Sequence, residues 1–502
     1  MKKIVVIGAG IAGLSAAIYA LRSGFDVTLC EQHFIAGGTC TSWRRKGYLF
    51  EGAVHWLTGS SSKTELYQVW KETGALDDDI KVLLSDPFAA VEYNGQTLNL
   101  YRNIDKTIKQ FTDKKNINEQ LIVLSPNDKK ILNRLLKDVK AFSNVQMPVF
   151  DIKGVKSKNP KRFTMGTLFK MLPAFPVLNR LKNISSKQYI QQFEHKGLRR
   201  LFNIVPDEYS AISIIGTLAT LNIGDGGYPE GGSLAMTERM VKTFTDLGGK
   251  LLLKTKVKKV NIENGITTGV TLDNDSSSII NADAVIVTQE TIAAVNQLFD
   301  TPLEDKWVKD LCSETKPVAC TFIGIGVKTE IPHDPIPSWE LTEPVLFAGE
   351  KITEIGFYNY SGFKGYAPDG CTSITTALMG DTYDFWKKAK QEGRYDEEKQ
   401  NIADKIKRVI CQKYPQMEGN IEVIDVATPL TYERYTGAYR GSWMSIASAG
   451  EKMKSYPGFI ENICGLYFAG HRLSSPGGLP VALFTGRQAA QMVCRQFDVV
   501  FN

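Results

Sequence analysis

Residues 3–31 read KIVVIGAGIAGLSAAIYALRSGFDVTLCE, and this stretch decides the fold. Its β-branched run Ile4–Ile7 is typical of a buried parallel strand, and a GxGxxG turn, Gly8–Gly13, follows at once. Apolar residues then recur at helical spacing as far as Leu21, before a second apolar run, Val27–Cys30, ends in Glu31. Strand, glycine turn, helix, strand and terminal acid in this order predict the first βαβ unit of a Rossmann-like sheet.

The glycines of this turn have physical roles in binding a dinucleotide. Gly8 permits the tight turn, Gly10 lets the backbone approach a pyrophosphate, and Gly13 lets helix and strand pack closely. The helix N-terminus directs unpaired N–H groups and a partial positive charge at the phosphates. Glu31 can accept hydrogen bonds from ribose hydroxyls, and its charge disfavours the 2′-phosphate of NADP. The stretch therefore predicts a dinucleotide site, with a fortuitous βαβ turn as the alternative.

A second glycine turn follows the acid within a few residues. Residues 37–57 read GGTCTSWRRKGYLFEGAVHWL, and the paired glycines Gly37-Gly38 are placed to approach the pyrophosphate from its other side. Thr39, Ser42 and the arginine pair of this stretch are candidate donors to phosphate or ribityl oxygens. The alternative is a solvated basic turn.

The C-terminal part of the chain repeats the pattern of strand, glycine and helix. Residues 465–470 read GLYFAG, a short strand that closes on Gly470, and HRLSSPGGLP follows from His471 to Pro480. A helix of small residues comes next, and its N-terminus is expected to face the same cofactor. Both ends of the chain are therefore predicted to meet at one dinucleotide.

These motifs, with YPEGG at 228–232, a strand ending VIVT at 288 and TPLTYERYTGAYRGS at 428–442, resemble those of one large flavoprotein group. The chain resembles the phytoene desaturase, carotenoid isomerase and retinol saturase branch of the flavin amine oxidase superfamily. The matching motifs come from both ends and the middle of the chain, in the expected order. The resemblance implies FAD as the cofactor and an FAD-dependent oxidoreductase as the activity.

The resemblance also implies roles for particular residues. It places Val54-His55-Trp56 near the flavin ring and the backbone of Val257 at the adenine. His471 stands where many relatives carry an acid, and no arginine directly follows the paired glycines, which weighs against an amine substrate. The residues expected to bind the cofactor are Gly8, Gly10, Ile11, Ala12, Gly13, Glu31, Gln32, Gly37, Gly38, Thr39, Ser42, Val54, His55, Trp56, Val257, Thr288, Gly470, His471, Gly478, Leu479 and Pro480.

We expect an α/β fold in which a discontinuous Rossmann-like, glutathione reductase-like FAD-binding domain is interleaved with an α+β substrate domain. Within the first of these, Asn264-Gly265 predicts a hairpin between two alternating stretches. No second strand–GxGxxG–helix unit appears, so no separate nicotinamide domain is expected. The predicted segments are 1–95, 227–299 and 455–502 for the FAD-binding domain, and 96–226 and 300–454 for the substrate domain.

The composition limits the other classes of function. A length of 502 residues exceeds what one core usually supports, while 43% hydrophobic and 23% charged residues are ordinary for a globular enzyme. A net charge of +6 is too small to indicate a nucleic-acid partner. The eight cysteines include no CxxC pair, so neither a metal site nor a disulfide framework is expected. No long uncharged apolar stretch and no signal-peptide core appear, which predicts a cytoplasmic protein; the oligomeric state stays open.

Residues 153–200 are rich in lysine and arginine and enclose the apolar stretch FTMGTLFKMLPAFPVL at 163–178. Basic residues that flank exposed apolar ones are typical of an element that contacts a membrane surface, here the inner face. The alternative is a solvated basic face beside buried apolar residues.

The predicted substrate is a long apolar isoprenoid, as the resemblance implies. Flavin chemistry would permit desaturation, saturation or cis–trans isomerisation, and the sequence does not choose among them. A flavin oxidase of a small amine or polar compound, and a non-catalytic flavin-bound lipid carrier, are the alternatives. His55 is the candidate catalytic residue, as an acid, base or polar anchor, against a structural histidine bonded within the fold.

Overall fold

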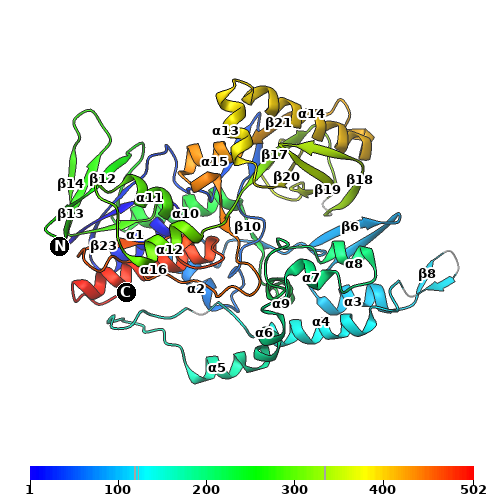
Figure 1. Ribbon diagram of the computed structural model, residues 1–502, viewed down its shortest axis with the longest axis horizontal. Helices are drawn as coiled ribbons and strands as arrows, with labels where there is room; N and C mark the ends of the chain where they lie inside the picture. Colours follow the sequence, from blue (N-terminus) through cyan, green and yellow to red (C-terminus); the bar gives the residue numbers. More distant parts are fainter. Residues whose placement is uncertain (118–119, 123, 148, 333–334) are drawn as a thin grey trace.

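The computed structural model describes residues 1–117, 120–122, 124–147, 149–332 and 335–502 (Figure 1). Both chain ends lie on the same side of the molecule, next to a five-stranded parallel sheet. Its strands, in spatial order, are β11 (Lys250–Leu252), β2 (Asp26–Cys30), β1 (Lys3–Ile7), β15 (Ala284–Val287) and β23 (Leu466–Phe468).

This sheet joins three distant parts of the sequence. The first strand is central, because Val5 pairs with Thr28 on one side and with Val285 on the other. Val285 in turn pairs with Leu466 near the C-terminus. The strands are buried on both faces, as their β-branched runs predict. The expected discontinuous Rossmann-like α/β fold is therefore confirmed.

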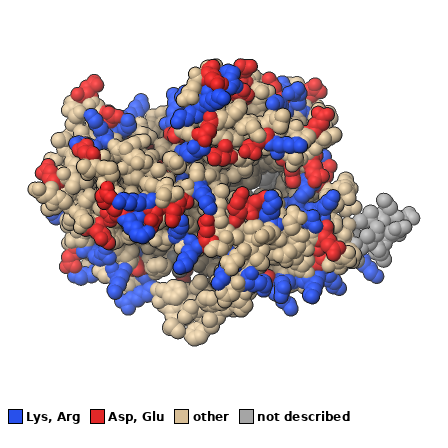
Figure 2. Space-filling view, in the orientation of Figure 1, with Lys and Arg blue, Asp and Glu red and all other residues tan. Residues whose placement is uncertain are grey.

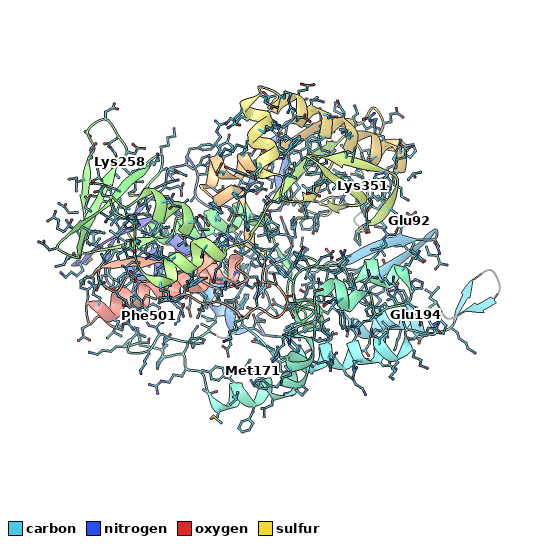
Figure 3. All side chains as sticks on the ribbon, viewed as in Figure 1. Glu92, Met171, Glu194, Lys258, Lys351 and Phe501 are labelled. Carbon is cyan, nitrogen blue, oxygen red and sulfur yellow. The ribbon has the colours of Figure 1, made fainter. Side chains whose placement is uncertain are left out.

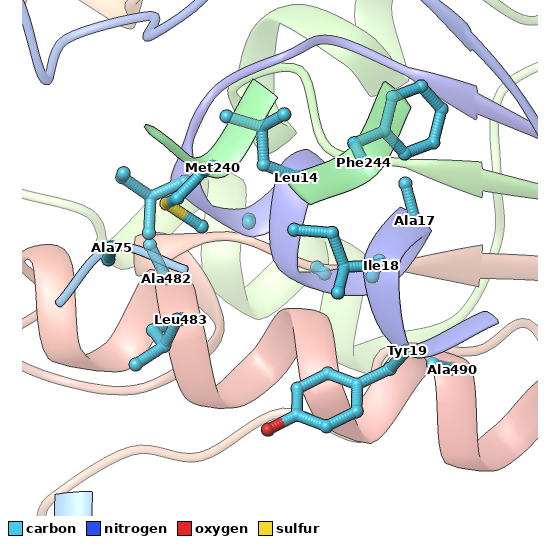
Figure 4. Close-up of a cluster of buried hydrophobic side chains, with 14 of the residues drawn as sticks. Leu14, Ala17, Ile18, Tyr19, Ala75, Met240, Phe244, Ala482, Leu483 and Ala490 are labelled. Atoms are coloured by element: carbon cyan, nitrogen blue, oxygen red, sulfur yellow. The ribbon is translucent and has the colours of Figure 1, made fainter. Parts of the chain in front are cut away.

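Three helices hold the sheet and the chain ends together: α1 (Ile11–Arg22), α10 (Gly232–Asp246) and α16 (Leu479–Gln496). Figure 4 shows Leu14 and Ile18 of α1 among apolar side chains of the other two helices, including Phe244 and Leu483. Helices α1 and α16 approach so closely that a Cβ on Gly486 would lie 2.3 Å from the carbonyl oxygen of Ala12. This contact fixes the C-terminal helix beside the first glycine turn.

A three-stranded antiparallel sheet, β12 (Val257–Glu263), β13 (Ile266–Leu272) and β14 (Ile279–Asn281), adjoins the parallel sheet. The two-residue turn Asn264-Gly265 joins its first two strands, and both residues have positive φ, as a type I′ turn requires. The predicted hairpin is confirmed.

The second large sheet has seven strands and lies at the upper right of Figure 1, with α13 (Tyr383–Gln391) and α14 (Tyr395–Lys413) above it. Its hairpin β6–β7 crosses residue 95, so the predicted boundary there would separate two paired strands. The division into two domains otherwise stays a prediction. In spatial order the strands are β21 (Ile421–Ala427), β17 (Cys320–Val327), β20 (Thr372–Met379), β19 (Glu350–Asn359), β18 (Ile336–Phe347), β6 (Ala89–Tyr93) and β7 (Gln96–Leu100).

A helical layer with its own apolar core lies below this sheet at the lower right. Its longest helix is α4, which contributes Leu132, Leu135 and Val139 to this core. The helices of this region are α3 (Ile104–Thr112), α4 (Lys129–Phe142), α5 (Met165–Met171), α6 (Phe175–Leu181), α7 (Ser186–Ile190), α8 (Lys196–Leu201) and α9 (Ile212–Asn222).

Shorter elements connect these layers. The helices are α2 (Glu65–Glu72), α11 (Thr291–Gln297), α12 (Lys306–Glu314) and α15 (Pro429–Thr436). The two-stranded pairs are β3 (Ser42–Arg45) with β4 (Tyr48–Glu51), β5 (Val82–Leu83) with β10 (Tyr228–Pro229), β8 (Lys115–Ile117) with β9 (Gln120–Ile122), and β16 (Pro317–Val318) with β22 (Met444–Ser445).

Candidate functional site

The first glycine turn leads directly from β1 into α1. Gly8 has a φ of +99°, which L side chains rarely adopt, and Gly10 is the N-terminal cap residue of α1. A Cβ on Gly13 would lie 1.9 Å from the carbonyl oxygen of Gly8, so this glycine permits close packing of helix on strand. By contrast, a Cβ on Gly10 would meet no atom closer than 3.8 Å, the carbonyl oxygen of Gly37, which is an ordinary van der Waals contact.

The second glycine turn lies against the first. The Gly37 N–H donates to the carbonyl oxygen of Ala9 at 2.8 Å, and a Cβ on Gly38 would lie 3.4 Å from the Cα of Gly10. The two turns therefore form one narrow slot of backbone, as their spacing in the sequence suggests.

Glu31 directly follows β2 beside this slot and is 8% exposed. Its carboxylate accepts hydrogen bonds from the backbone N–H groups of Ala9 and His33, both at 2.8 Å. A carboxylate has about four acceptor positions, so positions remain for ribose hydroxyls. The Thr288 hydroxyl, in contrast, donates to backbone oxygens of Ile7 and Gly8 and fastens β15 to the turn.

The C-terminal motif approaches from the opposite direction. Gly478, with a φ of +89°, caps the N-terminus of α16. The Nδ1 atom of His471 is buried and has no hydrogen-bond partner among the residues that the structure describes. Burial and the neighbouring charge of Arg472 hold the pKa of His471 well below its usual range, so its imidazole is neutral. Arg472 itself is buried and pairs with Glu290 at 2.8 Å, which fixes this motif to the N-terminal cap of α11.

One cavity of about 2690 Å³ joins these pieces. Of the residues predicted to bind a cofactor, Gly13 alone does not line it, because this glycine faces the turn instead. The others all do: Gly8, Gly10, Ile11, Ala12, Glu31, Gln32, Gly37, Gly38, Thr39, Ser42, Val54, His55, Trp56, Val257, Thr288, Gly470, His471, Gly478, Leu479 and Pro480.

The chemistry of this lining fits FAD. The slot between the glycine turns leaves room beside Gly10 where a pyrophosphate needs it, at the N-terminus of α1. Glu31 retains acceptor positions for a ribose, and the unpartnered Nδ1 of His471 is a polar atom for a ligand to satisfy.

His55 lies farther along the cavity, between two aromatic rings. Its imidazole stacks on Tyr358 with ring centroids 4.1 Å apart and on Phe322 at 5.7 Å. Burial lowers the pKa of His55 to about 4, so the ring is uncharged at neutral pH. Its Nδ1 atom has no partner in the described part of the chain, which does not support the alternative of a histidine hydrogen-bonded within the fold.

Glu51, a fully buried carboxylate, organises the segment before His55 and is not among the site residues predicted from the sequence. Glu51 accepts hydrogen bonds from the N–H groups of Ala53 and Val54 at 3.0 and 3.1 Å. The Tyr228 hydroxyl donates at 2.6 Å, and the Ser233 hydroxyl and N–H donate at 2.5 and 3.0 Å. The signal in the sequence that could have indicated this role is an acid at the end of a strand-like run, directly before Gly52. Glu51 therefore ties the turn that carries His55 to the start of α10.

The rest of the cavity has a largely apolar and aromatic wall. Figure 2 shows a hollow between the upper lobe, which carries α13 and α14, and the helical lobe below it. Tyr358 is 43% exposed yet lines the cavity, so its exposure is to this interior space. The apolar wall includes Trp56, Leu84, Phe88, Ala90, Ile204, Val205, Phe322, Ile336, Phe357, Tyr358 and Leu378.

The basic segment at 153–200 presents its apolar residues to solvent. Phe163, Met165 and Phe169 are 51, 66 and 63% exposed, and Leu172 and Phe175 are exposed as well. Figure 2 shows this region as an uncharged protrusion at the lower edge, with lysine and arginine beside it. The alternative of buried apolar residues is wrong for these five positions, although Val177 and Leu181 in the following α6 do enter the core.

Two other kinds of site are absent from the described residues. No helix there combines the length and apolar character that crossing a bilayer demands. No group of three or more His, Cys, Asp or Glu side chains there is arranged to hold a metal ion.

Residues 11–494 match the family described as "Flavin containing amine oxidoreductase". The chain is 24% identical to a 1-hydroxycarotenoid 3,4-desaturase of Flavobacterium sp., over 98% of this chain and 99% of that protein. It is 22% identical to the chloroplastic prolycopene isomerase of Daucus carota, over 97% of this chain and 79% of that protein. It is 23% identical to the human all-trans-retinol 13,14-reductase, over 88% of this chain and 76% of that protein.

Among solved structures, a putrescine oxidase superposes with a TM-score of 0.60 at 16% identity, covering 98% of each chain. At this identity the superposition supports the fold alone. With the family match spanning nearly the whole sequence, and a cavity whose chemistry fits the cofactor, this chain belongs to the flavin containing amine oxidoreductase family and is an FAD-dependent oxidoreductase.

Proposed function

We propose that this protein acts on C–C or C=C bonds of a long apolar isoprenoid, carotenoid-like or retinoid-like, by desaturation, saturation or cis–trans isomerisation. The observation that carries the proposal is one continuous cavity, which runs from the glycine turns to a largely apolar wall. Its volume of about 2690 Å³ is well above the roughly 300–1,000 Å³ of ordinary ligand pockets. There is thus room for a dinucleotide and a long substrate together. Relatives named as a desaturase, an isomerase and a reductase of such compounds support this reading.

FAD, when bound, takes up a hydride from a substrate carbon or, once reduced, returns one to a double bond. We propose that the glycine turns, the N-termini of α1 and α16, and Glu31 hold the nucleotide part of the cofactor. The apolar wall excludes water and holds the substrate chain in an extended form. His55 acts here as an uncharged polar anchor, since an imidazole with a pKa of about 4 carries no spare proton at neutral pH.

A spectroscopic experiment tests this function. The FAD-loaded protein is mixed anaerobically with a carotenoid, with all-trans-retinol, or with a small amine such as putrescine, in both flavin oxidation states. Bleaching of oxidised flavin by a polyene indicates desaturation. Conversion by reduced enzyme alone indicates saturation if flavin is reoxidised and isomerisation if it is not. A response to the amine alone would contradict the proposal in favour of an amine oxidase, and no response to any of them would favour a non-catalytic carrier.

We further propose that residues 163–175 dock on the surface of an anionic membrane, from which such a substrate would be taken up. Three considerations support the docking: the exposed Phe163, Met165 and Phe169, the local excess of lysine and arginine, and the placement of these residues on a protrusion. A few buried apolar side chains together with basic residues near anionic lipid suffice for peripheral binding.

Vesicle flotation tests the docking. The triple variant Phe163→Ser/Met165→Ser/Phe169→Ser should lose binding to vesicles rich in phosphatidylglycerol, while the unaltered protein binds them and not pure phosphatidylcholine. The control is Ile266→Ser/Ile279→Ser, which removes two exposed apolar side chains from the distant hairpin sheet. Equal binding by the triple variant and the unaltered protein would contradict the docking site.

A further inference from the structure

A basic surface groove lies along α4, outside both the cavity and the segment proposed to dock on a membrane. The groove has a volume of about 690 Å³, and α6 contributes one residue, Arg180, to its lining. The lining contains a single carboxylate, that of Asp138, among five cationic side chains. These cations are Lys129, Lys130, Arg134, Lys137 and Arg180.

Helical periodicity places three of the cations on one face of α4. Lys130, Arg134 and Lys137 are spaced at i, i+4 and i+7, so they lie above one another over about 10 Å of the helix axis. All three side chains are exposed. The other face of the helix enters the apolar core of the helical layer through Leu132, Leu135 and Val139.

Two carboxylates near these cations already have partners. Asp138 pairs with Arg180, and Glu194, labelled in Figure 3, accepts a hydrogen bond from Asn127 at 2.8 Å. No ion pair in the described part of the chain includes any of the three cations on the exposed face of α4. Positive charge without a partner along one groove favours an anionic ligand.

The groove and the docking segment belong to the same helical layer. Leu172 and Phe175 are exposed, whereas Ala174 and Val177 pack in the apolar core that also holds the inner face of α4. Figure 2 shows lysine and arginine along the lower edge, to the right of the uncharged protrusion, where Figure 1 places α4. The basic face and the apolar protrusion are therefore fixed relative to each other and lie on the same edge of the molecule.

The two surfaces together indicate the kind of anion. A free phosphate or a nucleic acid would contact the cations but leave the exposed Phe163 and Phe169 in water. An anionic phospholipid in a bilayer contacts both surfaces, because its acyl chains lie beneath a layer of phosphates. The planar guanidinium of Arg134 suits a phosphate, which it can bind through two N–H groups.

We infer that the groove on α4 binds the phosphate headgroups of anionic phospholipids through Lys130, Arg134 and Lys137. This inference rests on the proposed membrane docking and goes beyond it, because it adds a polar contact outside residues 163–175. The apolar protrusion inserts into the bilayer, and the groove selects anionic lipid and fixes the orientation of the protein on the surface.

Vesicle flotation of the FAD-loaded protein tests the inference with the variant Lys130→Ala/Arg134→Ala/Lys137→Ala. Each basic side chain at an anionic surface strengthens binding roughly fivefold, so this variant should bind phosphatidylglycerol-rich vesicles about tenfold or more weakly. Alanine suits a helix interior, so circular dichroism and flavin content should not change.

The matched control removes the same charges from the opposite lobe. Lys387→Ala/Lys407→Ala/Arg408→Ala alters exposed positions of α13 and α14, at the far side of the molecule in Figure 1. Its binding should stay within about twofold of that of the unaltered protein, because salt screens charges beyond about 8–10 Å.

The outcomes separate this inference from the docking itself. Unchanged vesicle binding by the groove variant, or an equal loss in the control, would overturn the inference and leave the docking site standing. Release of bound protein by millimolar inorganic phosphate, but not by chloride of equal ionic strength, would assign the groove to free phosphate instead. A groove variant that keeps vesicle binding but loses binding to an RNA oligonucleotide would assign it to nucleic acid. No vesicle binding by the unaltered protein would overturn both proposals.

Discussion

The two ends of the cavity are built in different ways. The cofactor end is made mostly of backbone, in glycine turns and helix N-termini contributed by short motifs such as Gly8–Gly13. The substrate end is made of side chains from separate strands and helices, such as Phe88, Ile204 and Tyr358. The comparison teaches that close backbone contacts limit which substitutions the cofactor end tolerates. At the substrate end, the shape and polarity of the wall set this limit. A family built this way can keep one cofactor while its substrates change.

The largest expected effect lies at the cofactor end, in Gly13→Ala. The new Cβ would lie 1.9 Å from the carbonyl oxygen of Gly8 and 2.7 Å from the hydroxyl of Thr288, so backbone must move. We expect a loss of about 3 kcal/mol or more in unfolding free energy and a loss of bound flavin. Urea unfolding and the visible flavin absorbance measure both. A variant as stable as the unaltered protein would contradict the tight packing of α1 on β1.

The next largest effect is expected for Glu51→Gln, in the segment between the two ends of the cavity. In the unaltered protein, backbone N–H and hydroxyl donors share the Glu51 carboxylate. The glutamine amide keeps the shape of this side chain but presents an NH₂ group to some of these donors. We expect a loss of about 2–4 kcal/mol by chemical denaturation. Ser233→Ala, which removes one donor and leaves the carboxylate, should cost clearly less. The reverse order of the two losses would argue against Glu51 as the organising group.

Glu31→Gln tests the cofactor end without altering its shape. The substitution replaces a charged acceptor beside the glycine slot by a neutral amide. Hydrogen bonds to a charged acceptor contribute about 1.5–3 kcal/mol, so the affinity for FAD should fall roughly 10- to 100-fold. Titration of the apoprotein with FAD, followed by quenching of flavin fluorescence, measures it. An unchanged dissociation constant would remove Glu31 from the proposed site.

His55, at the junction of the two ends, leads to a prediction about how the stability of the protein depends on pH. Burial lowers its pKa from 6.5 to about 4, so the unfolded chain takes up a proton there as pH falls while the native protein does not. Stability from this group is complete above pH 6.5 and declines as pH falls toward 4. Between pH 7.5 and 5 the unaltered protein should lose about 2 kcal/mol more than His55→Phe, which keeps the ring stack. Equal losses in urea unfolding would show that His55 is not held neutral.

The smallest effect is expected at the substrate end, in Gly216→Ala. Gly216 lies within α9 and lines the cavity, and a Cβ there meets no atom within 4 Å. Alanine in a helix interior is about 0.5–1 kcal/mol more favourable than glycine, so a slight gain in stability is expected. A loss above 1 kcal/mol would mean that this wall is as tightly constrained as the glycine turns.

The same contrast explains what the sequence could predict. The β1–α1–β2 unit, the Asn264-Gly265 hairpin and the meeting of the chain ends follow from local spacing, and the structure has all three. The ion pair between Arg200 of α8 and Glu354 of β19 joins residues 154 positions apart, and no local pattern brings them together. Glu51 was missed for a similar reason, since its side-chain donors come from Tyr228 of β10 and Ser233 at the start of α10, both distant in the sequence.

Other differences have physical causes that only the fold reveals. The predicted boundary at residue 95 falls in the Asn94-Gly95 turn of β6–β7, because this hairpin joins the seven-stranded sheet rather than the parallel one. Whether the apolar residues near Phe169 are buried depends on where the helical layer ends. Periodicity alone does not determine that.

The central claim is that one FAD fills the slot between the glycine turns, and Gly10→Val tests it most directly. A Cβ at this position makes only ordinary van der Waals contact with the protein, because its nearest protein atom is 3.8 Å away, and Gly10 has an ordinary φ of −74°. The account predicts a variant that folds normally by circular dichroism but contains no visible flavin after reconstitution, whereas the unaltered chain retains one FAD per polypeptide. A Gly10→Val protein that retains a full complement of FAD would contradict the account.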